Sequence, residues 1–287
     1  MWLGSEATKM RQPEFSTSLL PGRAILKVAG PDARHFLHNL LTADIEALTA
    51  GDATYSALLT PQGKILSDVF VFFDGISYFL DCAREQKHDL LKRLGMYKLR
   101  ASVTIGEAGD LEAAVAPEET IHALRYRDPR CADLGWRMIV PESRLEAKPG
   151  YDAARIALGL ADTGADLGSG EFFPHEANLD QLGGISFSKG CYVGQEVVSR
   201  MEHRGLARSR ILPVRLSGPA PSKGTDIRSG EKQVGQILSS AGRRGLALIR
   251  LDRLEESTEP LLTDAVTVTA LKPRWAGYEV PKAEEMA

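Results

Sequence analysis

The residues best suited to chemistry occupy one short run, the signature segment Lys189-Gly190-Cys191-Tyr192-Val193-Gly194-Gln195-Glu196. It combines a thiol with a lysine, a phenol, an amide and a carboxylate, an assortment that packing alone rarely requires. Its two glycines permit positive φ or a close approach of the backbone to a ligand. A thiol at or just before a helix N-terminus and next to a lysine is favoured as the thiolate, the form that attacks electrophiles and binds metals. We therefore predict that Cys191 is the reactive centre. The alternative is a small buried cysteine at a turn, with Glu196 and Arg200 as an ordinary surface pair.

Strands dominate the elements that must position this segment. Alternating apolar residues, with turn signals such as Asp74-Gly75 between them, predict antiparallel strands in the first half of the chain. The inserted helices do not follow the strand–helix–strand rhythm of a parallel sheet, so the predicted fold class is α+β, mostly antiparallel. The predicted strands are 24–28, 53–59, 64–73, 76–82 and 99–105, and the predicted helices start at Gly30-Pro31-Asp32 or span 84–96 and 151–160.

The composition of the chain changes near Arg208. Beyond it, short β-like segments are separated by Gly and Pro at the spacing of a small barrel. These segments are 211–216, 234–239, 246–251 and 265–271. We predict a body of residues 1–207 and a C-terminal β-barrel domain of residues 208–287, with about 51–110 as a candidate inserted β-rich unit of the body.

Bulk properties limit the classes of protein to which the chain can belong. Of its 287 residues, 43% are apolar and 25% are charged, as in an ordinary globular protein. A net charge of −3 and a pI near 6.1 argue against nucleic acid as a direct ligand. No apolar run is long enough to span a membrane, and residues 1–20 are interpreted as a loosely ordered leader.

The cysteines are too few and too scattered for a disulfide framework, and their spacing fits no metal motif. We therefore expect no stably bound metal. We also expect a reducing, cytoplasmic location, with the mitochondrial matrix as the alternative. The cysteines are Cys82, Cys131 and Cys191.

The signature segment resembles the Lys-Gly-Cys-Tyr-x-Gly-Gln-Glu pattern of the YgfZ family, and all seven specified positions match. That family comprises folate-binding, iron–sulfur-cluster-assembly relatives of the glycine-cleavage T-protein, in the aminomethyltransferase superfamily. The resemblance covers most of the chain, more weakly after residue 210, and implies a folate-binding α+β body followed by a small barrel. The other matching stretches are Phe173-Pro174-His175-Glu176-Ala177-Asn178-Leu179, His203-Arg204-Gly205, Leu41-Thr42-Ala43-Asp44-Ile45 and Gln62-Gly63-Lys64-Ile65-Leu66-Ser67-Asp68.

The resemblance implies a protein that binds tetrahydrofolate or a derivative and supports assembly or repair of iron–sulfur clusters in client enzymes, including tRNA-modifying enzymes. Its expected partners are folate and iron–sulfur client or assembly proteins, and its expected role is that of a non-enzymatic assembly factor. Two alternatives are a folate-dependent one-carbon (aminomethyl) transferase and an RNA-associated binding module. Two departures from the T-protein pattern argue against the transferase. Only Asp68 remains of two acids in that pattern. Ala157 also stands at the position of the T-protein glutamate whose carboxylate holds the pterin, and alanine cannot make that bond. The acidic pI argues against the RNA module.

A reduced folate presents a flat pterin, an aryl ring and an anionic tail. It therefore requires polar partners, aromatic or apolar walls and cations that can clamp carboxylates. Each candidate arginine could equally lie on a solvated helix face. Because ligand sites favour domain interfaces, we predict a central cavity between the body and the barrel, with Cys191 or Tyr192 on its wall. The candidate folate contacts are Lys189, Tyr192, Gly194, Gln195, Glu196, Arg200, Arg204, Tyr151 and Arg23.

Overall fold

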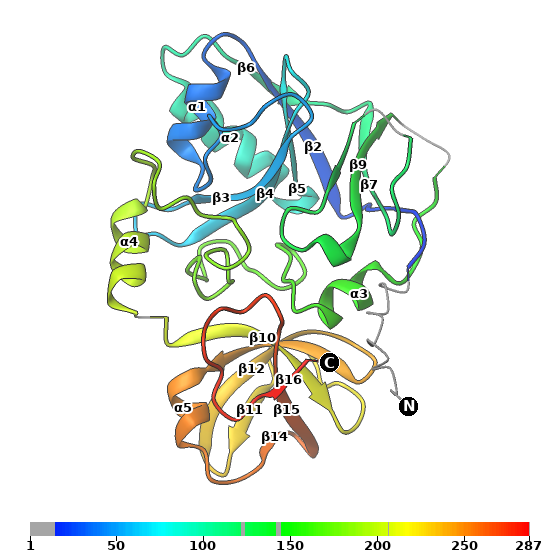
Figure 1. Cartoon of the computed structure of the whole chain (residues 1–287), viewed down its shortest axis with the longest axis vertical. Coiled ribbons are helices and arrows are strands. Elements are labelled where there is room, and N and C mark those ends of the chain that lie inside the picture. The colour runs from blue at the N-terminus through cyan, green and yellow to red at the C-terminus, as the bar shows by residue number, and fades with distance from the viewer. Residues whose placement is uncertain (1–14, 122–123, 142–144, 206, 287) are drawn as a thin grey trace, which may run out of the picture.

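A computed structural model describes residues 15–121, 124–141, 145–205 and 207–286. In it, an α+β body lies at one end of the molecule and a C-terminal β-barrel at the other (Figure 1). This arrangement confirms the predicted fold class. Most of the segment interpreted as a leader, residues 1–14, lies outside the described residues.

A five-stranded antiparallel sheet forms the centre of the body, in the order β3-β4-β5-β2-β6. The turn between β4 and β5 forms as its sequence predicts. The Asp74 carboxylate accepts hydrogen bonds from the backbone N–H groups of Ile76 and Ser77 at 2.8 and 2.6 Å, and Gly75 has a φ of 100°. Because β2 lies between β5 and β6, residues 51–110 do not form a sheet on their own. The strands are β2 (Arg23–Ala29), β3 (Ala53–Leu59), β4 (Ile65–Phe73), β5 (Tyr78–Ala83) and β6 (Thr104–Glu107).

Helices α1 (Ala33–Leu40) and α2 (Lys87–Lys98, after a 3-10 turn at Arg84–Gln86) share one hydrophobic core with this sheet. The predicted strand 99–105 is wrong over most of its length. Leu99 ends α2 with a φ of 42° and is 87% exposed, so the chain turns there and β6 starts only at Thr104. The alternation that suggested a strand falls on the turn by which the chain leaves the helix.

A second, four-stranded sheet has the order β1-β7-β9-β8 and packs with helix α3 (Tyr151–Ala157) in the core of the body. Residues 158–194, all of them described, then form neither helix nor strand, although Leu160, Leu167 and Leu179 are buried. This packed irregular segment leads into helix α4 (Gln195–Arg204), which lies on one side of the body (Figure 1). The strands are β1 (Ser18–Leu19), β7 (Leu111–Ala116), β8 (Arg125–Arg127) and β9 (Trp136–Pro141).

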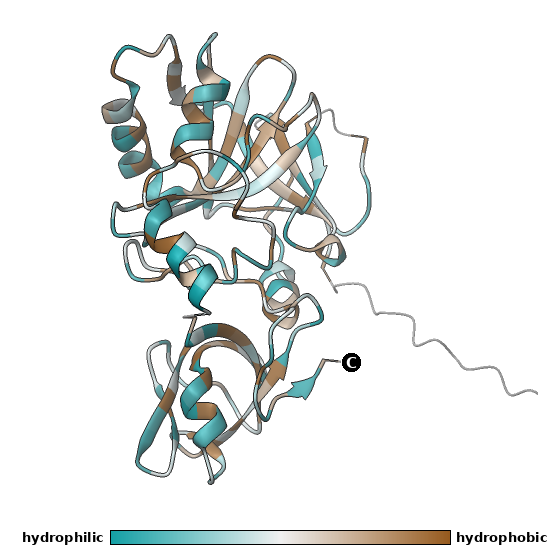
Figure 2. Cartoon of the chain, turned by 60° about the vertical axis from the view of Figure 1, so that its left-hand side comes forward, coloured by the Kyte–Doolittle hydropathy of each residue, from teal (hydrophilic) through white to brown (hydrophobic). Residues whose placement is uncertain are grey.

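The barrel follows the order β10-β13-β12-β11-β14-β15 and closes because β10 also pairs with β15. Each of the four β-like segments predicted beyond Arg208 falls mainly on one of these strands, which confirms the barrel. Hydrophobic residues lie along the strands of both the body and the barrel (Figure 2). The elements are β10 (Ser209–Leu216), β11 (Asp226–Ser229), β12 (Lys232–Ala241), β13 (Arg244–Arg250), α5 (Leu251–Glu256), β14 (Leu261–Thr263), β15 (Val266–Lys272) and β16 (Glu284–Glu285), which pairs in parallel with β15.

Candidate functional site

The signature segment forms the entry to α4, and its side chains divide into two sets. Lys189 and Tyr192 are buried, whereas Cys191 between them is exposed and is a free thiol. Gly194, with a φ of 83°, immediately precedes the first residue of α4. Cys191 thus lies just before a helix N-terminus, as the sequence predicts, and the interpretation as a small buried cysteine is wrong.

The Lys189 ammonium group is directed into the protein. It donates hydrogen bonds to the main-chain carbonyls of His38, of Leu41 at 2.6 Å and of Ala43 at 3.0 Å. Burial, opposed by the nearby Asp44 and Glu46 carboxylates, lowers the pKa of Lys189 to about 8. All three of these hydrogen bonds go to main-chain carbonyls and none goes to the thiol. Lys189 therefore acts on Cys191 through the conformation of the segment that carries both residues.

The other end of the signature segment rests on the turn between β3 and β4. A Cβ atom on Gly194 would lie 2.6 Å from the Thr60 carbonyl oxygen and 3.0 Å from the Gly63 Cα. Gly63 has a φ of 80°, and a Cβ atom there would lie 2.9 Å from Val197 Cβ. Only glycine permits this approach of two backbones. The two family-like stretches that contain Gly63 and Gly194 are therefore direct neighbours.

The polar residues at the start and along the length of α4 face solvent. Glu196, Arg200 and Arg204 are exposed, and Gln195 is half-buried. The two arginines therefore lie on a solvated helix face, which was the alternative to their being folate contacts.

A cavity of about 600 Å³ lies within the body, and its lining includes Arg23 and Tyr151. Neither Cys191 nor Tyr192 lines it, and no residue of the barrel does. The structure therefore brings together Arg23 and Tyr151 from the candidate folate contacts and places the signature segment elsewhere. The lining residues are 19–23, 83–85, 147–152 and 162–165.

Beside this cavity lies a buried network of arginines and aspartates from distant parts of the chain. Arg23 Nε and Arg137 Nη2 each lie 2.6 Å from an Asp81 carboxylate oxygen, and the Arg130 side chain pairs with Asp128 at 2.9 Å and Asp162 at 3.1 Å. The guanidinium groups of three of these arginines also stack around one aromatic ring, that of Phe70, at 5.3, 4.7 and 3.8 Å for Arg23, Arg130 and Arg137. Of this network the sequence pointed only to Arg23 and to the nearby Asp68, because the other members are far apart in the chain and meet only in the folded protein.

The charges of this network shift the pKa of its carboxyl groups, yet one atom of Arg23 and one of Asp68 have no hydrogen-bond partner among the described residues. Burial alone would raise the pKa of Asp162, but Arg130, Arg23 and Arg155 lower it to about 2. Arg23 Nη1 and Asp68 Oδ1 are buried 3.8 Å apart and make no hydrogen bond to any described residue. Buried polar atoms are normally paired, so these two mark a position where the polar interior is incomplete.

The low pKa of Asp162 predicts an acid-sensitive stability. A carboxylate with a pKa of about 2 in the folded protein and 3.8 otherwise stabilises the fold above the higher value, and this contribution is lost as the pH falls through the lower one. The expected loss is about 2 kcal/mol of unfolding free energy. Urea unfolding at about pH 5 and about pH 2 checks it, because Asp162→Asn should show less of this pH dependence. Equal pH dependence of the two proteins would contradict the assignment.

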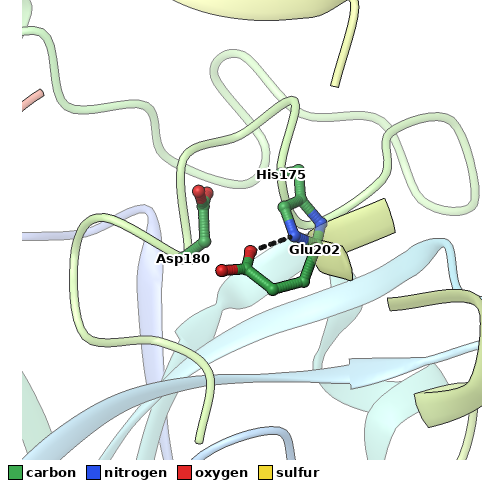
Figure 3. A group of neighbouring side chains, drawn as sticks. All are labelled: His175, Asp180 and Glu202. Carbon is green, nitrogen blue, oxygen red and sulfur yellow. Dashed lines mark hydrogen bonds and ion pairs between the residues drawn. The ribbon is translucent and has the colours of Figure 1, made fainter. Parts of the chain in front are cut away.

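A third polar group, which the sequence analysis missed, joins α4 to the loop before it and to the barrel. Candidate ligand atoms of His175, Asp180 and Glu202 lie within 4.8 Å of one another (Figure 3). The His175 Nε2 atom lies 3.1 Å from a Glu202 carboxylate oxygen. Both Asp180 oxygens, however, accept hydrogen bonds from Arg210 of β10, at 2.6 and 2.9 Å.

This group is better suited to joining elements than to holding a metal. Arg210 already neutralises the Asp180 carboxylate, and its positive charge opposes a cation at the same place. His175 Nδ1 is buried without a hydrogen-bond partner among the described residues, whereas a metal-bound histidine normally donates its second N–H. We therefore interpret the group as a polar tie between α4 and the barrel.

No helix within the described ranges is both long and apolar enough to cross a membrane.

Comparisons with known proteins agree over nearly the whole chain. Residues 208–278 match the family model for the C-terminal β-barrel domain of CAF17. Mitochondrial iron–sulfur cluster assembly factor IBA57 of Mus musculus is 32% identical, and the alignment covers 89% of this chain and 84% of that protein. The Homo sapiens protein of the same name is 31% identical with the same coverage, and a homologue from Pyricularia oryzae is 32% identical over 84% of this chain and 73% of its own length.

Among solved structures, the fold matches the glycine cleavage system aminomethyltransferase T from Bartonella henselae, with a TM-score of 0.74. The match covers 94% of this chain and 88% of that one at 15% sequence identity. At this identity the likeness shows the fold alone, and it confirms the predicted T-protein-like body with a terminal barrel.

Proposed function

This chain belongs to the IBA57 family of iron–sulfur cluster assembly factors, and we propose that it is a folate-binding, non-enzymatic factor whose Cys191 thiol meets the cluster or its client. The family lies in the YgfZ-related, aminomethyltransferase-like superfamily, so the resemblance carried by the signature segment is confirmed at that level. Membership of YgfZ itself stays a prediction.

The observation that carries the proposed role of Cys191 is its exposure between two buried neighbours. Lys189 and Tyr192 hold the segment in place, and the thiol alone between them faces solvent with an exposed glycine beside it. Thiolates are the protein ligands that iron–sulfur clusters prefer. A single exposed thiol cannot hold a cluster by itself, but it can supply one ligand while a partner protein supplies the others. We propose this transient contact as the chemistry of the site.

For folate, support comes from the cavity that Arg23 and Tyr151 line. Its volume of about 600 Å³ lies within the usual range for small-molecule sites, roughly 300–1,000 Å³. The Asp162 carboxylate suits the amino group and ring N–H of a pterin, and Tyr151 supplies an aromatic wall. Arg23, which also lines the cavity, places a cation in its wall for an acceptor atom of the ligand.

Aminomethyl transfer is the weaker candidate because its remaining acid, Asp68, does not line the cavity. Asp68 is fully buried, accepts a hydrogen bond from the Tyr55 hydroxyl at 2.9 Å and lies next to Arg23. A general acid or base must lie within hydrogen-bond reach of the atom that exchanges the proton. We therefore propose that folate binding is kept without one-carbon transfer. The clients that we propose remain iron–sulfur enzymes, including tRNA-modifying enzymes.

For the cellular location, the relatives from Mus musculus and Homo sapiens are named as mitochondrial proteins. This favours the mitochondrial-matrix alternative over the cytoplasm that we expected from the cysteines.

Tetrahydrofolate is expected to raise the melting temperature of the protein. A ligand that binds only the folded state stabilises it by about 2.7 kcal/mol at a hundredfold excess over its dissociation constant. Arg23→Met should reduce the shift measured against its own ligand-free form, because Arg23 lines the cavity. Differential scanning fluorimetry with several reduced folates provides the measurement.

Arg204→Met is the matched control, since Arg204 is exposed on α4 and does not line the cavity. Loss of the shift in this control but not in Arg23→Met would move the folate site to the α4 surface. The absence of a shift with every reduced folate would remove folate from the proposal and leave the role of Cys191 to be tested separately.

A further inference from the structure

Lys189 is an unusual residue for the place it occupies. Lysine side chains are almost never fully buried without a partner, since removing an ammonium group from water carries a large desolvation cost. Lys189 is only 8% exposed, and its ammonium group lies 5.1 Å from the centre of the Tyr192 ring. An apolar side chain of similar length would fill the same space without that cost. The charge must therefore be retained for the contacts it makes.

Those contacts are with the end of another element. Helix α1 ends at Leu40, and the last carbonyl groups of a helix lack partners within the helix. The Lys189 ammonium group is such a partner. It donates hydrogen bonds to the His38 carbonyl and, just beyond the helix, to the carbonyls of Leu41 and Ala43. A cation is also favoured at a helix C-terminus by the helix dipole. One side chain thus joins the signature segment to the end of α1.

The chain that precedes Lys189 also binds to the residues just after α1. The Thr42 hydroxyl donates to the Gly184 carbonyl at 2.6 Å, and the Ser186 N–H donates to the Thr42 carbonyl at 2.9 Å. On the far side, Gly194 packs against Gly63. The short arch 190–193 that carries Cys191 is therefore fixed at both ends.

We infer that Lys189 is a positioning residue for Cys191, holding the arch on the carbonyls of residues 38–43 so that the thiol projects from a fixed backbone. This inference rests on the proposed function only in taking Cys191 as the working thiol. The buried contacts of Lys189 and Tyr192 leave the Cys191 thiol exposed between them. A thiolate that shares a cluster with a second protein benefits from a fixed backbone, because the segment that carries the thiolate need not be ordered at each encounter.

The test measures the order of the arch directly, without folate or a cluster. In a Cys131→Ser background, where Cys82 is buried, a nitroxide reagent labels the exposed Cys191. Lys189→Met should shorten the rotational correlation time of the label several-fold, measured by electron paramagnetic resonance well below the melting temperature. A label at Ser240→Cys, an exposed position on β12, in a Cys191→Ser protein should keep its spectrum. Lys232→Met, which alters an exposed lysine of the barrel, should change neither label.

An unchanged Cys191 spectrum in Lys189→Met would overturn the inference, as would equal loosening of both labels, which would indicate general destabilisation. If Lys189→Met does not fold, Lys189→Arg replaces it with the same expected direction. Its planar guanidinium cannot direct three converging donors as an ammonium group does. The cellular effect of Cys191→Ser decides the proposed function separately, so failure of that function and failure of the positioning role give different results.

Discussion

Cys191→Ser is expected to reduce the activity of client iron–sulfur enzymes to the level seen without the protein. The hydroxyl is nearly the same size as the thiol, and the side chain is exposed, so the unfolding free energy should change by less than about 0.5 kcal/mol. A serine hydroxyl is, however, a far poorer nucleophile and metal ligand than a thiolate near neutral pH. The measurement is the activity of iron–sulfur enzymes in cells that carry each variant as their sole copy.

The other two cysteines are the controls for this experiment. Burial raises the pKa of the Cys82 thiol to about 12 and also raises that of Cys131, so both are held in the unreactive thiol form. Cys131→Ser should leave client activity unchanged, and any effect of Cys82→Ser should follow from lost packing and appear in its melting temperature. Normal client activity in Cys191→Ser would reduce the signature segment to a structural turn, and the thiol-centred role would have to be abandoned.

Local sequence patterns were sufficient for most of the strands. The predicted strand 53–59 coincides with β3, and 64–73 differs from β4 by one residue, because tight turns rich in Gly, Pro and Asp bound both strands. The barrel strands were found for the same reason. The strand 99–105 was misplaced since an alternating pattern cannot reveal that α2 continues to Lys98 and that Leu99 then adopts a positive φ.

The candidate site likewise has one part that local sequence predicts and one part that it does not. The signature segment is contiguous, so its position before a helix was predictable from neighbouring residues alone. The buried network is assembled from residues far apart in the chain. Arg23 meets Asp81 across the β2–β5 pair, and Arg137 reaches Asp81 from the second sheet. Each of these residues on its own looks like an exposed charge on a half-buried strand. Tertiary pairing, which no short pattern encodes, decides that they face inward.

Arg137→Met is expected to lower the unfolding free energy by about 3–5 kcal/mol, as removal of one partner from a buried ion pair usually does. The Arg137 side chain is buried, binds the Asp81 carboxylate through two nitrogens at 2.6 and 3.1 Å, and donates to the Tyr151 hydroxyl at 2.9 Å. Although burial alone would raise the pKa of Asp81, Arg137 and Arg23 together lower it. Methionine keeps much of the volume but leaves this carboxylate to Arg23 alone. Urea unfolding followed by circular dichroism gives the free energies.

Arg215→Met provides the matched control in the barrel. Arg215 pairs with Glu284 at 2.5 Å, but both side chains are 53% exposed. Exposed pairs of this kind contribute about 0–1 kcal/mol, since water and salt screen them and ordering two long side chains is unfavourable. The same substitution should therefore have a several-fold larger effect at residue 137 than at residue 215. Similar losses at the two positions would mean that the buried network does not hold the two sheets of the body together. The polar wall beside the cavity would then be available to rearrange around a ligand at little cost in stability.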